Sequence, residues 1–575
     1  MIPLATLNSM LAPEFVSALG AIFEHSPWVA GHVVGARPFR SRLHLHEAMC
    51  EAVLRAGKDE QLALIRAHPE LAARGDLTAA STREQKGAGL ADCSPDELAR
   101  IRALNAEYSE RFGFPFVLAV KGHNAASILA ELERRVHNDS ETERAVALAQ
   151  IGRIAGFRLA DLVEESVGAQ IMAMADQLAR FSEQDAALTC SYLTPAHRRT
   201  AAQIREWMLT AGLETEMDAV GNVVGRWRCG LPEAKVLITG SHFDTVVNAG
   251  RYDGRLGILL PVAVLGRMKR SGVKLPFDIE VVGFAEEEGV RFKSTFLGSA
   301  ALTGRFDMKW LENVDAAGVS MREAMREAGL DPARIPDAAR DPGRVAGFIE
   351  VHIEQGPVLL TDGAPLGVVT TIAGSVRALV TITGVAGHAG TVPMHLRQDA
   401  AAAAAEIVLA VEQRCSGTPG LVGTVGRLNV PDGAMNVIPG RCELSIDIRS
   451  GDDVLRRAAY EDVLVASERI AARRNVTLDI RKVLEIDAVP CDADMQRRWA
   501  DSIRRVTHNA QAPHLPSGAG HDAMMMASLA PMGMLFVRCG NGGISHHPDE
   551  LLAEDDAELA AQAFSDFLMT FSVTA

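Results

Sequence analysis

The apolar residues of the first 165 positions recur at the helical spacing of three and four residues. One such face in "NAASILAELERRV" is formed by Ile128, Leu129, Leu132 and Val136. "SPDELARIRALNAEYSERFG" predicts a helix with Ser94 as its N-cap and Gly113 just beyond its end. "DSETERAVALAQIGRIAGF" repeats this start, with Ser140 as the expected N-cap and Glu143 completing a capping box. Strand patterns are scarce here, so we expect an all-α domain.

After about residue 200 the pattern changes to short apolar runs that alternate with helices. "AKVLITG" (234–240) and "DIEVVGF" (278–284) predict buried strands, and "LGILLPVAVLGRMKRSG" (256–272) predicts a buried helix between them. A strand, a helix and a second strand form a βαβ unit, which implies a largely parallel sheet covered by helices.

A second α/β pattern lies between about residues 375 and 485. It consists of "VRALVTITGVAG", the alanine-rich helix "DAAAAAAEIVLAVEQR" and the strand "RCELSIDIRS". This segment interrupts the first pattern and predicts a smaller domain inserted into the larger one.

Composition narrows the class of protein. The 575 residues are 48% hydrophobic and 23% charged, which is ordinary for globular domains, and they carry a formal charge of −15. An acidic balance argues against nucleic acid or an anionic membrane as the main partner. The start "MIPLATLNSMLAPEF" has no basic and apolar leader pattern, no apolar run reaches about 18 residues, and the cysteines are scattered. We therefore expect a cytoplasmic protein.

Histidines and carboxylates gather where the predicted strands end. They are His242, Asp244, Asp253, Glu286, Glu287, Glu288, His352 and His546. A single histidine at a strand end is usually packed or solvated, and a run of glutamates is usually a solvated face. Carboxylates crowded at one buried sheet edge repel one another unless a cation neutralises them. The pattern alone leaves open both a solvated acidic edge and a site for two divalent ions.

The motifs from about residue 170 onward resemble the M20 family of binuclear metallohydrolases. They occur in the order "GSHFDTV", "GRYDG", "AEEEGVRF", "VHIEQGPVL", "GHAGTVPM", "GAMNVIPG", "DIR", "SGAGHDA" and "GISHHPDE". The most similar branch contains amidohydrolases that act on carbamoyl (ureido) groups. The resemblance implies an α/β metallohydrolase domain (167–375 and 486–575) with an inserted α+β lid and dimerisation domain (376–485), behind an all-α domain (1–166).

The resemblance also implies a ligand set for two divalent metal ions per subunit, manganese or zinc. His242, Asp253 and His352 are expected to hold one ion, and Asp253 is expected to bridge to a second ion held by Glu288 and His546.

Further residues of these motifs receive roles from the same resemblance. Asp244 is expected to orient the ring of His242, and Glu287 to act as general base. Glu286 has no implied role and is expected to support the site or to be solvated. His547 adjoins the expected ligand, but the spacing Ser-His-x-Pro favours His546.

The inserted domain is expected to complete the hydrolytic site. His388 resembles the residue that reaches across a homodimer to stabilise the oxyanion, and Asn436 and Arg449 resemble substrate binders. Gln355 and the backbone at Gly520 are further substrate-binding candidates.

The helical segment resembles a different enzyme family, 2-oxo-4-hydroxy-4-carboxy-5-ureidoimidazoline (OHCU) decarboxylase, which forms S-allantoin. The resemblance is carried by "SPWVAGHVVGARPF", "LIRAHPELA", "STREQKGAGL", "FGFPFVLAVKG" and "RIAGFRLADLV". Without it, the histidine of "AHPEL" would be a buried residue near a helix end. With it, His68 is the expected general acid/base, and no cofactor is implied. The expected substrate-binding residues are Pro69, Ser81, Glu84, Gln85, Phe116, Val117 and Arg158.

Together the two resemblances predict a bifunctional enzyme of purine catabolism that acts on small ureido molecules. It would decarboxylate OHCU and hydrolyse allantoate to ureidoglycine, ammonia and carbon dioxide. Two alternatives stay open. The hydrolase could act on N-carbamoyl-L-amino acids or ureidoglycolate, or one half could be a non-catalytic assembly module.

Overall fold

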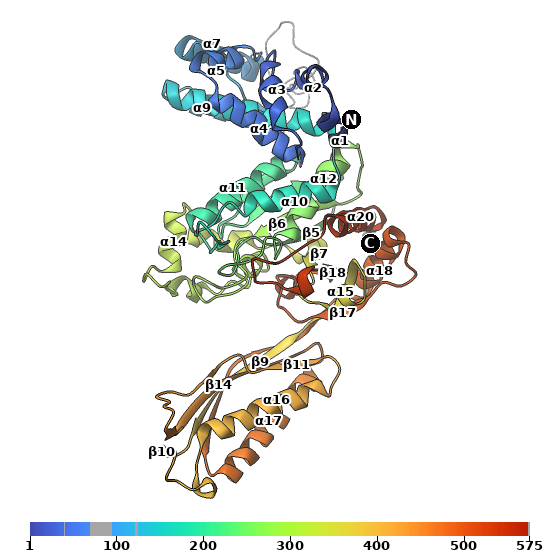
Figure 1. The fold of residues 1–575 in the computed structure, drawn as a ribbon. Helices are drawn as coiled ribbons and strands as arrows, with labels where there is room; N and C mark the ends of the chain where they lie inside the picture. Colours follow the sequence, from blue (N-terminus) through green and yellow to red (C-terminus); the bar gives the residue numbers. More distant parts are fainter. Residues whose placement is uncertain (40, 70–94, 121–124, 573–575) are drawn as a thin grey trace. The chain divides into compact units, whose positions relative to one another are not determined.

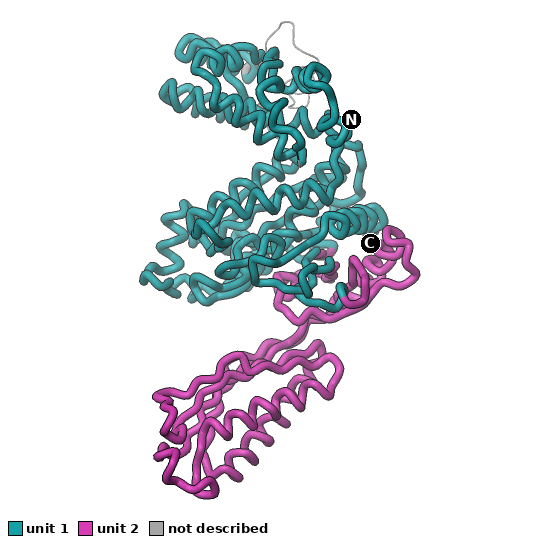
Figure 2. Tube along the Cα trace, viewed as in Figure 1, with its two compact units in different colours: residues 1–346, 351–360, 537–575 teal, residues 347–350, 361–536 magenta. Residues whose placement is uncertain are grey.

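The computed structural model describes the chain except residues 40, 70–94, 121–124 and 573–575. It divides into two compact units, drawn in different colours in Figure 2. Unit 1 contains residues 1–346, 351–360 and 537–575, and unit 2 contains residues 347–350 and 361–536.

The first part of unit 1 is helical (Figure 1). Its elements are β1 (Ile2–Pro3), α1 (Leu4–Ser9), α2 (Ala12–Leu19), α3 (Trp28–Val33), η1 (Val34–Ala36), α4 (Arg42–Arg55), α5 (Lys58–Arg66), α7 (Pro95–Phe112), α8 (Ala125–Arg135), α9 (Ser140–Leu162) and β2 (Val163–Glu164). The predicted apolar face of α8 joins one buried core, in which Ile128 and Leu132 are fully buried. The only strands among the described residues of this part are β1 and β2, which pair over two residues. The helical prediction for this segment is therefore confirmed.

The helix starts of this part match the sequence prediction only in part. Gly113 has a φ of +73° directly after α7, as expected of a glycine that ends a helix, whereas Ser94 lies outside the described residues. The predicted cap of α9 is wrong. Asp139 is the N-cap, with its carboxylate accepting from the backbone N–H groups of Glu141 and Thr142.

Glu143 cannot complete a capping box because it is buried in an ion pair. Its Oε1 accepts hydrogen bonds from Nε (2.9 Å) and Nη2 (2.5 Å) of Arg135 and from the hydroxyl of Tyr108. The guanidinium of Arg135 also lies 4.4 Å from the ring centroid of Phe116, and its Nη1 donates to the carbonyl of Val117 at 2.8 Å. The side chains of Arg135 and Glu143 are both fully buried, so each charge depends on the other.

The rest of unit 1 is α/β. Its elements are α10 (Val167–Leu178), α11 (Pro195–Thr210), β3 (Glu214–Met217), β4 (Val223–Trp227), β5 (Val236–His242), α12 (Leu256–Arg270), β6 (Asp278–Phe284), α13 (Leu297–Leu302), η3 (Met308–Glu312), α14 (Met321–Glu327), η4 (Pro332–Ala338), η5 (Pro342–Arg344), β7 (Val345–Ile353, which passes through residues of both units), α15 (Val358–Thr361), η7 (Asn541–Gly543) and α20 (Glu554–Thr570). Within unit 1 the strands of the nine-stranded sheet follow the order β7-β5-β6-β4-β3. Helix α12 packs on β5 and β6 and is buried along most of its length. Among the described residues, no helix is both long and apolar enough to cross a membrane.

The sheet is more mixed than the sequence predicts. β5 and β6 are parallel and in register from Val236 and Asp278 onward, as expected for a βαβ unit. β4 pairs antiparallel with both β3 and β6. The five-residue connection between β3 and β4, in which Gly221 has a φ of +87°, is too short for a crossover and forces the antiparallel pairing.

Unit 2 contains a small sheet with two long helices. The sheet has the order β11 (Leu421–Thr424), β14 (Arg441–Ser450), β9 (Gly374–Thr383), β15 (Thr477–Ile486), and β12 (Leu428–Asn429) also pairs with β14. Helices α16 (Ala400–Ser416) and α17 (Asp453–Arg474) share one apolar core with it. The remaining elements are β8 (Leu366–Ile372), β10 (Gly387–His388), η6 (Met394–Leu396), β13 (Val437–Ile438), β16 (Val489–Pro490), α18 (Ala493–Thr507), β17 (His514–Ser517), α19 (Ala523–Met526) and β18 (Met532–Val537).

The buried pair of the helical part supports a stability prediction. Arg135→Met leaves the carboxylate of Glu143 buried without its cation, so we expect the helices around it to lose about 3–5 kcal/mol. Hydrogen exchange of the α8 and α9 amides in the full chain measures this loss locally. The neighbouring variant Arg134→Met removes only a half-exposed pair with Glu131 and should cost less than about 1 kcal/mol. Equal losses in the two variants would contradict the assigned role of the buried pair.

Candidate metal centre

Five side chains from distant segments of unit 1 converge at one edge of its sheet. The ligand atoms of His242, Asp253 and His352 lie within 4.8 Å of one another, and so do those of Asp253, Glu288 and His546. Asp253 belongs to both groups. The structure thus brings together all five residues that the sequence singles out as metal ligands.

The two oxygens of Asp253 face different histidines. Oδ1 lies 3.5 Å from Nε2 of His352, and Oδ2 lies 3.0 Å from Nε2 of His546. The same Nε2 of His546 is 3.5 Å from Oε1 of Glu288. A carboxylate that presents one oxygen to each ligand group has the geometry needed to bridge two cations.

The two buried imidazoles are oriented through their Nδ1 atoms. Nδ1 of His352 lies 2.9 Å from the carbonyl of Ile353, and Nδ1 of His242 lies 3.1 Å from the carbonyl of Asp244. A hydrogen on Nδ1 satisfies those carbonyls and leaves Nε2 with its lone pair, which is the form that binds a metal.

Gly254 allows the backbone to approach these rings closely. It has a φ of +64°, and a Cβ at this position would lie 2.4 Å from the ring of His242. The turn after Asp253 therefore requires glycine both for its conformation and for the space that the imidazole occupies.

Asp244 links the ends of β5 and β6. Its Oδ1 lies 3.3 Å from Nδ1 of His242 and accepts the backbone N–H of Glu287, and its Oδ2 accepts the backbone N–H of Glu288. One carboxylate thereby positions a histidine and the two glutamates to which the sequence assigns ligand and base roles.

Glu286 is not solvated, so that part of the expectation is wrong. Its side chain is fully buried. Burial and the neighbouring charge of Asp244 raise the pKa of Glu286 well above its usual range. A protonated Glu286 lets the chain bury a third consecutive acid without adding another negative charge.

The electrostatics of the acids fit a cation. Burial, opposed by the charge of His242, raises the pKa of Glu288 to about 7. Burial and the charge of Asp253 likewise raise the pKa of Glu550 to about 7. Divalent ions replace such protons when they bind, because they neutralise the clustered carboxylates directly. The set of histidine nitrogens and carboxylate oxygens suits zinc and manganese alike.

Glu550 supports the site, although no motif or pattern in the sequence predicts this role. It is buried, and its Oε1 accepts the backbone N–H groups of Tyr252 (2.8 Å) and Asp253 (3.2 Å). The hydroxyl of Ser545 donates to its other oxygen at 2.8 Å. Glu550 thus joins the loop of Asp253 to the loop of His546, almost 300 residues apart along the chain.

Gln355, a predicted substrate binder, contacts the cluster of expected metal ligands. Its Nε2 donates to Oδ1 of Asp253 at 2.9 Å and lies 3.4 Å from Nε2 of His546. Its backbone has a φ of +56°. His547 points elsewhere, with Nδ1 accepting the backbone N–H of Asp549 at 3.2 Å.

The residues expected in the decarboxylase pocket are described only in part. His68 is buried two residues after α5, with Nδ1 2.9 Å from the carbonyl of Leu64, and Pro69 follows it, half-buried. The predicted residues Ser81, Glu84 and Gln85 lie outside the described part of the chain.

Arg158, Phe116 and Val117 are all buried. Nη1 of Arg158 lies 2.7 Å from the carboxylate of Glu24. The expected anion binder therefore already has a carboxylate partner. The side chains of Phe116 and Val117 belong to the apolar core of the helical part.

The four remaining predicted residues belong to unit 2. His388 and Asn436 are exposed, and they lie near each other in the chain's fold because β10 and β13 pair beside them. Arg449 is half-buried, donates to Asp447 through Nε and Nη2, and donates to the carbonyl of Gly518 through Nη1. Gly520 is exposed in the following loop.

Known structures and curated proteins resemble the second part of the chain. Allantoate deiminase of Arabidopsis thaliana is 40% identical over 71% of this chain and 83% of its own length. N-carbamoyl-L-amino acid amidohydrolase of Geobacillus stearothermophilus is 42% identical over 64% of this chain and 90% of its own. A crystal structure of an amidase of the hydantoinase/carbamoylase family from Burkholderia multivorans matches with a TM-score of 0.66 and 28% identity, over 71% of this chain and 98% of that one.

Family models match both halves of the chain. Residues 8–160 match the OHCU decarboxylase family, and residues 232–570 match peptidase family M20/M25/M40. The second match spans the five converging side chains and more than half of the sequence. With its ligand cluster at the sheet edge, this chain belongs to the M20/M25/M40 peptidase family and carries an OHCU decarboxylase domain ahead of it.

Proposed function

We propose that this protein is a bifunctional enzyme of purine catabolism, in which the helical domain decarboxylates OHCU to S-allantoin and the M20 part hydrolyses allantoate. Ureidoglycine, ammonia and carbon dioxide would be the products of the second reaction. The observation that carries the hydrolytic half is the pair of ligand groups that share Asp253 beside Glu287. The observation that favours allantoate is the OHCU decarboxylase domain in the same chain.

His242, Asp253, His352, Glu288 and His546 would hold two divalent ions, manganese or zinc. When bound, such ions supply Lewis acidity, which lowers the pKa of water and polarises a carbonyl group.

Glu287 would act as the proton carrier of the hydrolysis. It takes a proton from the attacking water and delivers it to the leaving nitrogen of the ureido group. Its backbone N–H is held by Asp244 at 3.0 Å, which positions the carboxylate next to the ligands.

Unit 2 would bind the substrate and stabilise the oxyanion. Arg449 would offer a guanidinium fork to the substrate carboxylate, and Asn436 and the Gly520 backbone would be further substrate binders. His388 would donate to the oxyanion from the second subunit of a homodimer, which requires a lid movement of the inserted domain.

In the helical domain, His68 would act as the acid/base. Arg158, Glu84 and Gln85 would hold the anionic, ureido-bearing substrate. The electrons left by carbon dioxide move into the imidazoline ring and its carbonyl, and protonation from one fixed face sets the handedness of allantoin. No cofactor is needed for this step.

The second candidate is hydrolysis of N-carbamoyl-L-amino acids by the M20 part. It is favoured by the relative from Geobacillus stearothermophilus, whose identity to this chain is 42%.

The substrate assignment predicts a clear preference. The purified protein should release ammonia from allantoate with a kcat/KM at least tenfold above that for N-carbamoyl-L-amino acids. Arg449→Lys should raise KM for allantoate about 10–100-fold, because an ammonium cannot pair with a carboxylate in two-point fashion. Arg427→Lys, at an exposed arginine of the same unit, serves as the control. Absence of ammonia release from allantoate would refute the assignment.

The two catalytic assignments should separate by mutation. Glu287→Gln should lower kcat for ammonia release about 10²–10⁴-fold and leave decarboxylation of OHCU unchanged. His68→Asn should have the reverse effect. If both activities fell in either variant while the melting temperature held, the two halves would not be independent catalysts.

Metal binding gives a test that does not depend on turnover. Titration calorimetry of the stripped protein with Mn²⁺ or Zn²⁺ should show two sites, both weakened strongly in Asp253→Asn. Glu550→Ala should weaken binding about 10–100-fold, because it releases the backbone that presents Asp253. Asp549→Asn changes an exposed acid in the same loop and should bind as the unmodified protein does. Equal binding by Glu550→Ala would refute the positioning role.

A further inference from the structure

The small sheet of unit 2 has an open face that carries a cavity. Helices α16 and α17 lie on its other face (Figure 1), where they share a core with the buried side chains of β9 and β14. Side chains alternate along a strand, so Arg377 of β9 and Asp447 and Arg449 of β14 point to the open face. With Thr424 of β11 and the loop at Gly518, they line a cavity of about 620 Å³, which is within the range of small-molecule pockets.

The ionic side chains of this cavity contact one another. Among the described residues, the charged members of the lining are Arg377, Asp447 and Arg449. Oδ2 of Asp447 accepts from Nε of Arg377 at 3.0 Å and from Nη2 of Arg449 at 2.9 Å. Partial burial raises the pKa of Asp447, but the hydrogen bonds and charges of Arg449 and Arg377 outweigh it and hold that pKa below its usual range. Asp447 is therefore ionised at neutral pH, and the three side chains together carry one positive charge.

The guanidinium of Arg449 is fixed in a way that leaves one end for a ligand. Its Nε and Nη2 donate to Asp447, and its Nη1 donates to the carbonyl of Gly518 at 2.8 Å. A guanidinium has five N–H donors, so each terminal nitrogen keeps one more N–H. This parallel pair suits the substrate carboxylate proposed for Arg449, and that carboxylate cancels the remaining positive charge of the cavity.

Arg377 is then available for a neutral group. Its side chain is 47% exposed, and among the described residues its terminal nitrogens make no hydrogen bond. Asp447 balances its charge once the substrate carboxylate has balanced that of Arg449. A second anion would add an uncompensated negative charge, whereas a carbonyl oxygen can accept from the terminal nitrogens of Arg377 without changing the charge.

Thr424 offers a complementary atom on the other side of Asp447. In the sheet register, Thr424 of β11 and Arg377 of β9 both pair with Asp447 of β14, so the three side chains form a row across the open face. Thr424 is exposed, and among the described residues its hydroxyl makes no hydrogen bond. A hydroxyl accepts hydrogen bonds as well as donating one. The row therefore presents both donors and an acceptor to a ligand in the cavity.

We propose that Arg377 and Thr424 bind the second ureido group of allantoate, the one that is not hydrolysed. The inference rests on the function proposed above, because it takes Arg449 as the binder of the substrate carboxylate. The ureido carbonyl oxygen accepts from the terminal nitrogens of Arg377, and a ureido N–H donates to the hydroxyl of Thr424. An N-carbamoyl-L-amino acid with an apolar side chain has neither group at this position. Arg377 and Thr424 thus determine specificity between the two substrate classes.

Allantoate and N-carbamoylglycine are a matched pair of substrates for this test. Both carry a carboxylate and a ureido group on one carbon, and allantoate carries a second ureido group there. In Arg377→Met, the ratio of kcat/KM for allantoate to kcat/KM for N-carbamoylglycine should fall about tenfold or more, mainly through a higher KM for allantoate. Thr424→Val should lower the same ratio about threefold or more. The general attraction of Arg377 for anions affects both substrates and cancels in the ratio.

A third variant is the control. Arg481→Met removes an exposed arginine of the neighbouring strand β15, outside the cavity lining, and should leave the ratio unchanged. An unchanged ratio in Arg377→Met would overturn the inference, as would an equal fall in Arg481→Met. If Arg377→Met lost its native melting transition, the ratio in Thr424→Val would decide. Failure of the unmodified protein to hydrolyse allantoate is a different outcome, because it refutes the proposed function and the inference with it.

Discussion

The M20 part of this chain is organised by the need to hold several carboxylates close together at one buried edge of a sheet. Asp244, Asp253, Glu286, Glu287 and Glu288 would repel one another there without compensation. Backbone N–H groups compensate part of this repulsion, because the carboxylate of Asp244 accepts hydrogen bonds from the backbone N–H groups of Glu287 and Glu288. A proton on Glu286 supplies another part. Two cations between Asp253 and its neighbours would supply the rest.

Much of the fold could be predicted because burial leaves a periodic pattern in the sequence. β6 and β14 begin and end where the patterns "DIEVVGF" and "RCELSIDIRS" place them. The pattern was insufficient where tertiary contacts compete with local ones. Ser140 followed by Glu143 resembles a capping box, but the buried cation Arg135 removes Glu143 from that role, and Asp139 caps the helix instead. Strand β3 was missed because its mostly polar residues carry little strand pattern, and β4 because its short apolar run is interrupted by Gly225 and Arg226.

The residues of the metal centre also divide into those that the sequence could predict and those that it could not. The five expected ligands could be named because the resemblance to the M20 family assigns them, and the sheet brings the strand ends on or near which they lie together. Glu550 could not be named, because its role is to accept backbone N–H groups from a loop almost 300 residues earlier. Any acid near the ligand His546 has the same local appearance. Only the fold distinguishes Glu550, which is buried, from Asp549, which is exposed.

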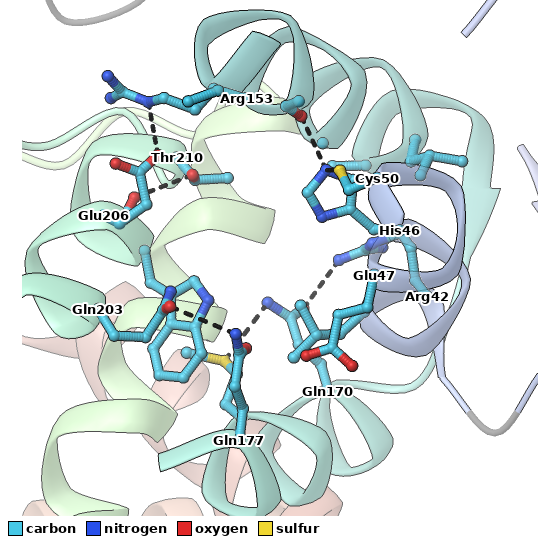
Figure 3. A pocket seen from close by; sticks show the side chains of 18 of the residues that line it. Arg42, His46, Glu47, Cys50, Arg153, Gln170, Gln177, Gln203, Glu206 and Thr210 are labelled. Carbon is cyan, nitrogen blue, oxygen red and sulfur yellow. Dashed lines mark hydrogen bonds and ion pairs between the residues drawn. The ribbon is translucent and has the colours of Figure 1, made fainter. Parts of the chain in front are cut away.

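The contact between the helical domain and the α/β part of unit 1, unlike the metal centre, is held by weak interactions. Its ion pairs, Arg153 with Glu206 and Arg180 with Glu47, are partly exposed, and such pairs contribute at most about 1 kcal/mol each. The apolar residues that remain are arranged around a cavity (Figure 3), so they contribute less than a packed core would. A contact held this weakly would gain a large fraction of its stability from any molecule that filled the cavity.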